Sequence, residues 1–363
     1  MLVLALAAAA VSCASAQRDT KPTPRFLAGG PQSGEPATVS PPVASATIPP
    51  PVASAAARAP SAPANTSPPS SPPAVPRWVG FYIPDVPLQI APLATLQSET
   101  GQFPAVSHYF LGVAAESFST ASAGNAAAMG ATPMITLEFW DYRMATNAQP
   151  DFSLKRIAAG AHDAYLRKFA RDAAEFGNPV WLRPLHEMNG SWYPWCGTVN
   201  GNSSADFAAA WRHIYRVFHE EGATNVRFVW CPEATSVPDT SDNAIARYWP
   251  GDSYVDYVAL DGYNAGTRGA WRSFGKIFSR GYADVIRLTD KPLFIAEVGC
   301  ADTGGDKAAW IADMFRELSS AYPRIRGVVW FDALKEHDWR IESSASSLAA
   351  FRQGARQWIA TPD

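Results

Sequence analysis

Two glutamates stand at the ends of apolar segments that are typical of buried strands. Glu187 closes the segment Val180–Glu187, and Glu297 lies near the end of Leu293–Val298. A carboxylate in such a place costs solvation free energy unless it is hydrogen-bonded or takes part in chemistry. Two carboxyl groups that flank a glycosidic bond can hydrolyse it: one protonates the leaving oxygen, and the other attacks the anomeric carbon or activates water. A structural ion pair with Arg183 explains the same charges, and spacing alone favours neither explanation.

The two-residue period of a β-strand predicts where these groups point. It places Arg183 and Glu187 on one face of the first segment, and Ile295 and Glu297 on one face of the second. Both carboxylates are therefore expected to point inward.

Large aromatic residues accompany the pair. Trp192, Tyr193 and Trp195 follow Glu187 within one loop. Further aromatics near other strand ends are Trp249, Tyr263, Trp271 and Trp330. Such rings stack on the apolar C–H faces of pyranose sugars, whose hydroxyl groups bond to polar side chains. The pattern indicates a saccharide site.

The chain from residue 77 onward alternates short apolar runs with helical patterns. Strands are predicted at Trp78–Ile83, Val106–Leu111, Pro133–Phe139, Val180–Glu187, Val226–Cys231, Val255–Asp261, Leu293–Val298 and Gly327–Phe331. Helices are predicted at Leu154–Phe176, Ser204–Glu221, Trp271–Leu288 and Lys307–Ala321, and less strongly at Leu88–Gln97 and Leu348–Trp358. Apolar strands that alternate with helices indicate a parallel sheet covered by helices. Eight such units predict an α/β fold, a (β/α)8 barrel whose site lies where the strands end.

An open, doubly wound sheet is the alternative fold. Its first strand would normally be followed by a glycine-rich turn, whereas the first strand here is followed by Pro84 and Asp85. The chain has no G-x-G-x-x-G or Walker pattern after that strand, so nucleotide binding loses support.

The first 76 residues differ in composition from the rest. They hold 16 of the 31 prolines and one aromatic residue, Phe26, and the hexapeptide PPVASA occurs twice. Residues 17–76 cannot bury a core, so they are predicted to be a disordered Pro/Ala/Ser/Thr-rich linker. The catalytic domain is predicted at residues 77–363.

Residues 1–16 begin with an apolar run that is too short to span a bilayer but is typical of a signal peptide. Residues 14–16 resemble an ordinary cleavage site, whereas residues 11–13 resemble a lipobox with Cys13 as the lipid-anchored residue. Both alternatives stay open, and either predicts export, with the protein secreted or attached to the cell envelope.

Charge and cysteine content narrow the possible partners. The formal charge is −3, from 30 Lys+Arg and 33 Asp+Glu, and no basic cluster occurs, so nucleic acid is not an expected partner. Cys196, Cys231 and Cys300 have no metal-ligand spacing. A disulfide, for example between Cys196 and Cys231, and three free thiols stay equally open. We expect a monomer.

The most specific motif in the chain runs from Arg183 to Trp195, RPLHEMNGSWYPW. It resembles the acid/base motif of glycoside hydrolase family 26, the β-mannanase family of the retaining (β/α)8 clan. The stretches YWPGD at 248–252, YVALDGYN at 257–264 and IAEVG at 295–299 also resemble that family. The resemblance covers nearly all of residues 77–363.

The resemblance implies that Glu187 is the general acid/base and Glu297 the nucleophile, with their carboxyl groups about 5 to 5.5 Å apart. Residues implied to bind the substrate are His108, Arg183, His186, Trp192, Tyr263 and Trp330, with Tyr263 near the nucleophile and Trp330 as a platform beneath the sugar. No metal and no other cofactor is expected, because no histidine has a metal-ligand spacing.

The expected partner is therefore a polysaccharide or oligosaccharide. Family members act on β-1,4-mannan, on mixed-linkage β-1,3-1,4-glucan or on β-1,3-xylan, and mannan is the commoner activity that the resemblance implies. The Tyr193-Pro194-Trp195 ending keeps the glucan alternative open. A barrel that binds polysaccharide without cutting it is the alternative from another class, and the presence of both carboxylates argues against it.

Overall fold

The barrel is built from eight parallel strands that pair in sequence order and close on themselves. The computed structural model describes residues 76–144, 146–266 and 271–361. The strands are β1 (Trp78–Tyr82), β2 (Pro104–Gly112), β3 (Thr132–Glu138), β4 (Val180–Pro184), β5 (Val226–Trp230), β6 (Tyr257–Asn264), β7 (Leu293–Cys300) and β8 (Ile325–Phe331). Because β1 pairs with both β2 and β8, no strand edge is left in the barrel. The predicted (β/α)8 fold is confirmed.

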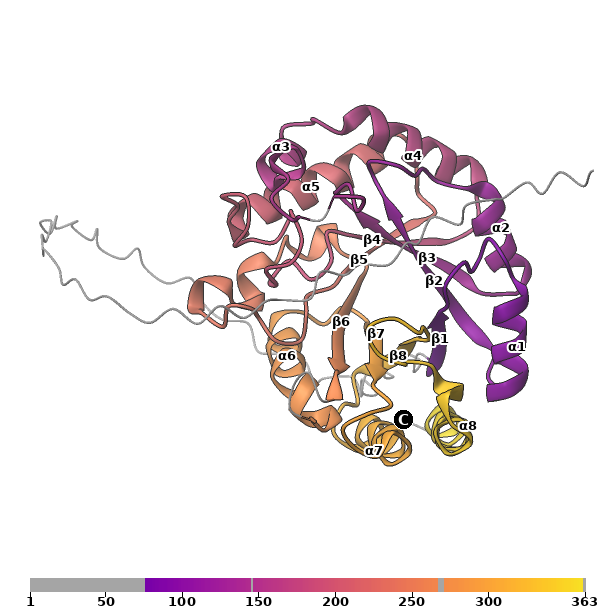
Figure 1. The fold of residues 1–363 in the computed structure, drawn as a ribbon. Helices are drawn as coiled ribbons and strands as arrows, with labels where there is room; N and C mark the ends of the chain where they lie inside the picture. The colour runs from indigo at the N-terminus through magenta and orange to yellow at the C-terminus, as the bar shows by residue number, and fades with distance from the viewer. Residues whose placement is uncertain (1–75, 145, 267–270, 362–363) are drawn as a thin grey trace, which may run out of the picture. The chain divides into compact units, whose positions relative to one another are not determined.

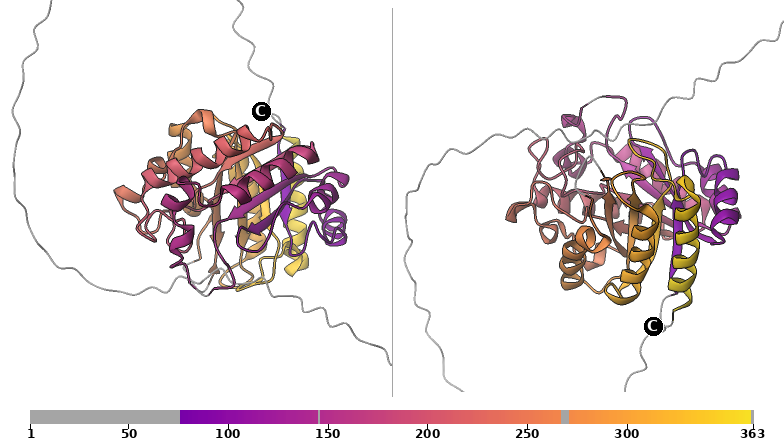
Figure 2. Two further views of the ribbon diagram at one scale, coloured as in Figure 1. Left: turned by 90° about the horizontal axis from the view of Figure 1, so that it is seen from above. Right: turned by 60° about the horizontal axis from the view of Figure 1, so that its bottom comes forward.

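Helices surround the strands (Figure 1). They are α1 (Ala91–Thr100), α2 (Thr120–Ala128), α3 (Leu154–Ala158), α4 (Asp163–Phe176), α5 (Ser204–Glu220), α6 (Phe274–Leu288), α7 (Lys307–Ser320) and α8 (Ala345–Ala360). Short 3₁₀ helices lie at η1 (Pro150–Phe152), η2 (Ser241–Asn243), η3 (Ile245–Tyr248), η4 (Asp252–Tyr254) and η6 (Ile341–Ser343). Helix α8 packs against both α7 and α1, so the last helix closes the ring against the first (Figure 2).

Three elements differ from the prediction. The helix predicted over Leu154–Phe176 is broken into α3 and α4 around Gly160, whose φ of +83° is incompatible with a continuing helix. Strand β4 ends at Pro184, three residues before Glu187. Helix α2 was not predicted, because its buried face consists of small residues, Ser122, Ala123 and Ala126, which give little amphipathic contrast.

The strands separate two apolar layers. Along β8, Val328 and Trp330 belong to the layer between the barrel and the helices, whereas Val329 faces the barrel interior. The interior cluster consists of Val106, Met134, Val229, Cys231, Ala259, Phe294, Ala296 and Val329. In (β/α)8 barrels the functional residues lie at the carboxyl ends of the strands.

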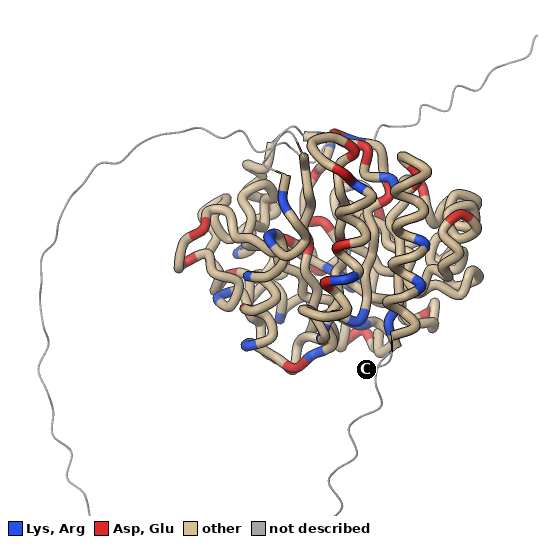
Figure 3. Tube along the Cα trace, turned by 90° about the horizontal axis from the view of Figure 1, so that it is seen from below, with Lys and Arg blue, Asp and Glu red and all other residues tan. Residues whose placement is uncertain are grey.

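Acidic and basic residues are interspersed over the chain (Figure 3). Within the described ranges, each helix falls short of the length or hydropathy that a membrane span requires. The predicted signal segment 1–16 and the linker 17–76, apart from Pro76, lie outside the described residues, as does Cys13.

Candidate active site

Glu297 points into the barrel because strand β7 contains an irregularity. In the pairing with β6, Leu260 lies opposite Ile295 but Asp261 lies opposite Glu297, so β7 carries one extra residue at Ala296. The pairing with β8 shifts at the same place. Ala296 and Glu297 therefore both face inward, while Ile295 packs toward the helices. The prediction that Ile295 and Glu297 share a face is wrong, although Glu297 does point inward as expected.

The guanidinium of Arg183 lies against Glu297. Arg183 is fully buried, and its Nη2 donates to Glu297 Oε1. Its Nη1 donates to Asp261 Oδ2 at 2.5 Å. Burial opposes the charge on Arg183, but the carboxylates of Asp261 and Glu297 raise its pKa well above the ordinary value. The guanidinium of Arg183 therefore lies between the buried carboxylates of Asp261 and Glu297.

Tyr263 is a second donor to Glu297. Its hydroxyl group donates to Glu297 Oε2, so each carboxylate oxygen has its own donor. Charge-assisted bonds of this kind stabilise the ionised form of a carboxyl group. The placement agrees with the expectation that Tyr263 lies within hydrogen-bond reach of Glu297.

The loop after β4 places Glu187 through an unusual backbone. Leu185 and Glu187 have φ values of +54° and +52°, a left-handed conformation that costs free energy in residues with a side chain. Hydrogen bonds hold it: Glu187 N donates to Cys231 O at 2.8 Å, and Trp195 Nε1 donates to His186 O at 2.7 Å. The loop is thereby tied to the next strand and to its own aromatic side chains.

The carboxylate of Glu187 lies close to that of Glu297 at the carboxyl ends of the strands. Trp192 Nε1 donates to Glu187 Oε2 at 2.6 Å. One carboxylate oxygen of Glu187, one of Glu297 and a ring nitrogen of His186 lie within 4.8 Å of one another. The structure therefore brings the two glutamates together, with His186 beside them.

His186, Glu187 and Glu297 also have the donor types and the spacing of a metal site. Glu297 already accepts from Arg183 and Tyr263, and Glu187 accepts from Trp192. A cation bound there would lie close to the positively charged guanidinium of Arg183, and like charges repel each other. These contacts therefore suit two carboxyl groups that act on a bound substrate better than they suit a metal ion.

His186 and His108 occupy different places. The Nε2 of His186 lies 3.2 Å from the Tyr193 hydroxyl group, and 4.0 Å from the Glu138 carboxylate. His108 is fully buried, with its Nε2 2.7 Å from Thr136 Oγ1 and 3.2 Å from Arg183 Nη2. His108 therefore lies next to Arg183. The role of His108 as a substrate contact stays a prediction.

Trp330 does not lie at the mouth. Its ring is fully buried against Trp310 of α7 and Phe351 of α8, and its Nε1 donates to Trp339 O at 2.8 Å. The prediction that Trp330 is a platform beneath the sugar is therefore wrong, because Trp330 follows the outward face of β8. The indole beside the site belongs to Trp339, whose ring centroid lies 5.1 Å from that of Tyr263.

Sequence reasoning gave no role to three residues that the structure brings to this site: Thr136, Asp261 and Trp339. Asp261 ends a predicted strand, so its position at a strand end was a usable signal. Thr136 and Trp339 carry no such signal, because a threonine in a strand and a tryptophan in a loop are common. The cysteines Cys196, Cys231 and Cys300 are free, which excludes a disulfide among these three described thiols.

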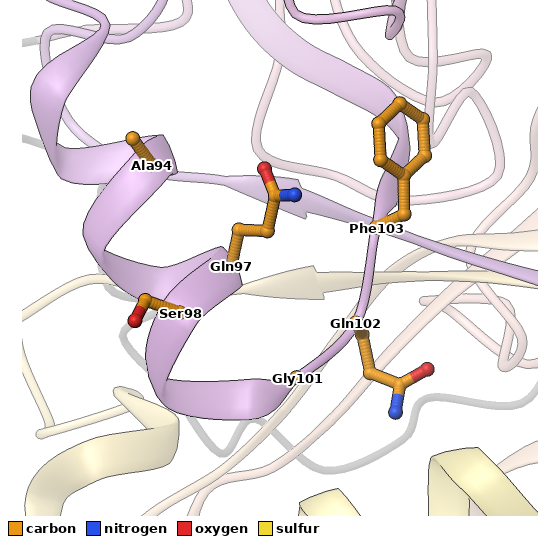
Figure 4. A pocket seen from close by; sticks show the side chains of 6 residues that line it. All are labelled: Ala94, Gln97, Ser98, Gly101, Gln102 and Phe103. Carbon is orange, nitrogen blue, oxygen red and sulfur yellow. The ribbon is translucent and has the colours of Figure 1, made fainter.

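A hollow lies away from this site, at the end of α1 (Figure 4). Its lining residues are Ala94, Gln97, Ser98, Gly101, Gln102 and Phe103. They precede the start of β2, so the hollow lies at the amino ends of the strands, opposite the carboxylates. Its lining side chains include no titratable group, and Ser98 carries the one hydroxyl group among them.

A closed parallel barrel with two facing carboxylates at its mouth, one ion-paired and one bonded to an indole, defines the class of barrel glycoside hydrolases. The model of glycosyl hydrolase family 26 matches residues 132–345. The chain belongs to this family, which confirms the family resemblance of the sequence.

Individual relatives carry several names. The chain is 39% identical over 230 residues to endoglucanase H of Acetivibrio thermocellus. This match covers 62% of this chain and 24% of that protein. It is 30% identical over 197 residues to a mannan endo-1,4-beta-mannosidase of Bacillus subtilis, covering 51% of this chain and 48% of that one. The chain thus spans less than half the length of these two relatives.

The fold is also similar to a solved mannanase of Bacillus subtilis, man26. The TM-score is 0.54 at 23% identity, and the match covers 75% of this chain and 83% of that one. This likeness supports the barrel fold alone.

Proposed function

We propose that the protein is a retaining glycoside hydrolase of β-linked polysaccharides, with Glu187 as the acid/base and Glu297 as the nucleophile. The observation that carries the proposal is the approach of the two carboxylates to within 4.8 Å between oxygen atoms. Retaining enzymes hold their carboxyl groups about 5–5.5 Å apart, whereas inverting enzymes leave about 6.5–9.5 Å for a water molecule. The short separation favours direct attack by a carboxylate.

The hydrogen bonds support this division of labour. Glu297 accepts from Arg183 and Tyr263, which keeps it anionic and ready to attack. Glu187 accepts from the indole of Trp192 and lies beside the negative charge of Glu297. A nucleophile must be ionised and an acid must be protonated, so the two environments fit the two roles.

In the first step, Glu297 attacks the anomeric carbon while Glu187 gives its proton to the leaving oxygen, and the glycosidic bond breaks. The covalent ester neutralises Glu297. Glu187, now a carboxylate, takes a proton from water, which attacks the same carbon and releases Glu297. Two inversions leave the configuration of the sugar retained.

The substrate is proposed from similarity. Mannan is the substrate that the sequence resemblance implies, and the named mannosidase shares 30% identity with this chain. The protein named endoglucanase H shares 39% identity, a specific observation in favour of a β-glucan. We therefore propose β-glucan and β-mannan as the two candidate substrates.

A panel assay tests the proposal. The full chain is incubated with β-mannan, lichenan, β-1,3-xylan and cellulose, and the anomer of the first product is followed by NMR. We expect cleavage of lichenan or mannan, with the β-anomer appearing before mutarotation. Initial release of the α-anomer would contradict the retaining mechanism. Binding to these polymers without any cleavage would instead support a non-catalytic binding barrel.

A further inference from the structure

Thr136 lies at the centre of the contacts that hold Arg183. It is fully buried on β3, directly opposite Arg183 in the pairing of β3 with β4. Its Oγ1 is 2.7 Å from Arg183 Nε and 2.7 Å from His108 Nε2. One hydroxyl group therefore connects the arginine to the buried histidine.

The direction of each hydrogen bond follows from the chemistry of the groups. A guanidinium has only donors, so Thr136 Oγ1 must accept from Arg183 Nε. The Nη2 of Arg183 lies 3.2 Å from His108 Nε2, which must accept as well. The single hydroxyl proton of Thr136 then points to the same His108 nitrogen. This pattern assigns His108 as a neutral imidazole with its proton on Nδ1.

The assignment completes the coordination of Arg183. A guanidinium carries five N–H donors. Nε is used by Thr136, Nη1 by Asp261 and Cys231, and Nη2 by Glu297 and His108. With an acceptor for every donor, the planar group has one orientation, and that orientation aims Nη2 at Glu297.

We propose that Thr136 is a positioning residue for Glu297, acting through Arg183 and through the tautomer of His108. The inference rests on the proposed function of Glu297 as the nucleophile. Without the hydroxyl group, the Nε donor of Arg183 loses its acceptor. His108 is then able to carry a proton on Nε2, which would set a donor against Arg183 and push Nη2 away from Glu297.

The test is a pair of substitutions at Thr136. Thr136→Val keeps the branched shape but removes the hydroxyl group, and Thr136→Ser keeps the hydroxyl group. We expect Thr136→Val to lower kcat/KM about 10- to 100-fold, since a misplacement of about 1 Å near the reacting groups costs this much. The acid side of its pH–rate profile should move to higher pH, because less positive charge lies beside Glu297. Thr136→Ser should restore both quantities.

Thr132→Val is the matched control. It makes the same chemical change on the same strand, at the end away from the carboxylates. Its activity and pH profile should equal those of the unsubstituted protein. A folded Thr136→Val variant with an unchanged pH–rate profile would overturn the inference.

A second measurement needs no folded variant at Thr136. Nitrogen-15 NMR of histidine-labelled protein distinguishes a protonated from an unprotonated ring nitrogen, and His108→Gln identifies the His108 signals. We expect the proton on Nδ1, and a proton on Nε2 would overturn the inference. Glu297→Ala is assayed in parallel. Retained activity in that variant would contradict the proposed function, whereas the NMR result decides the Thr136 contact on its own.

Discussion

Ala296 and Glu297 are neighbours in one strand, and both face the inside of the barrel. A regular strand would send one of them toward the helices. The extra residue in β7 removes this constraint, since Asp261 pairs with Glu297 directly after Leu260 has paired with Ile295. Bulges of this kind are frequent next to active sites, where they redirect a side chain. Here the bulge supplies a buried carboxylate to Arg183 and Tyr263.

Substitution of Glu297 tests its role as the nucleophile. Glu297→Gln keeps the shape of the side chain and removes its charge, so the attack on the anomeric carbon should fail. We expect hydrolysis to fall on the order of 10⁴-fold or more. Circular dichroism should show an intact fold, since Arg183 keeps its partner Asp261. Unchanged hydrolysis would remove Glu297 from the mechanism.

Substitution of Glu187 should depend on the leaving group. Glu187→Ala removes the proton donor, so hydrolysis of a polysaccharide should fall about 10²–10⁴-fold. Formation of the glycosyl-enzyme from an aryl glycoside with an acidic phenol should fall far less, because that leaving group needs no proton. Single-turnover rates on both substrates provide the comparison. Equal losses on the two substrates would argue against an acid role.

Substitutions of Trp330 and Trp339 should have different effects, the first on stability and the second on activity. Trp330→Phe removes a buried hydrogen bond and part of a buried ring, so the free energy of unfolding should fall by about 1–3 kcal/mol. Trp339→Leu removes the ring beside Tyr263 and should lower kcat/KM roughly 10-fold or more. Urea denaturation and steady-state kinetics of both variants check this division. A larger kinetic defect in the folded Trp330→Phe variant would restore the platform role to that residue.

Asp332 should make stability depend on pH. Burial and the neighbouring carboxylate of Glu342 raise the pKa of Asp332 well above its ordinary value, against the opposing hydrogen bond from Ile341 N and the charge of Lys307. The unfolded chain releases this proton at a lower pH than the folded protein does, so the contribution of Asp332 to stability falls as pH rises from about 4 toward the raised pKa.

Asp332→Asn removes that titration and keeps the acceptor for Ile341 N, which lies 2.7 Å from Asp332 Oδ1. The variant should match the unsubstituted protein near pH 4 and exceed its free energy of unfolding at pH 8. Urea denaturation at the two pH values measures the difference. A variant that is less stable at pH 8 would contradict the inferred direction.

The sequence by itself determined the barrel and indicated the two glutamates that we propose as the catalytic pair. Apolar runs that alternate with helical patterns are local signals, and they located all eight strands. The segment from Arg183 to Trp195 and the acidic residue in β7 identified Glu187 and Glu297, because a charge in an apolar strand needs a reason.

Only the tertiary structure decided how the side chains meet. The face of Glu297 depends on a one-residue shift against β6 and β8, and a single-residue shift reverses the direction of a side chain. Trp330 lies outward because β8 itself is regular and pairs with β1 without a shift, and the indole of Trp339 lies beside the site instead. The contacts among Thr136, His108, Arg183 and Asp261 join four strands. Their positions follow from barrel closure, which no local pattern in the sequence encodes.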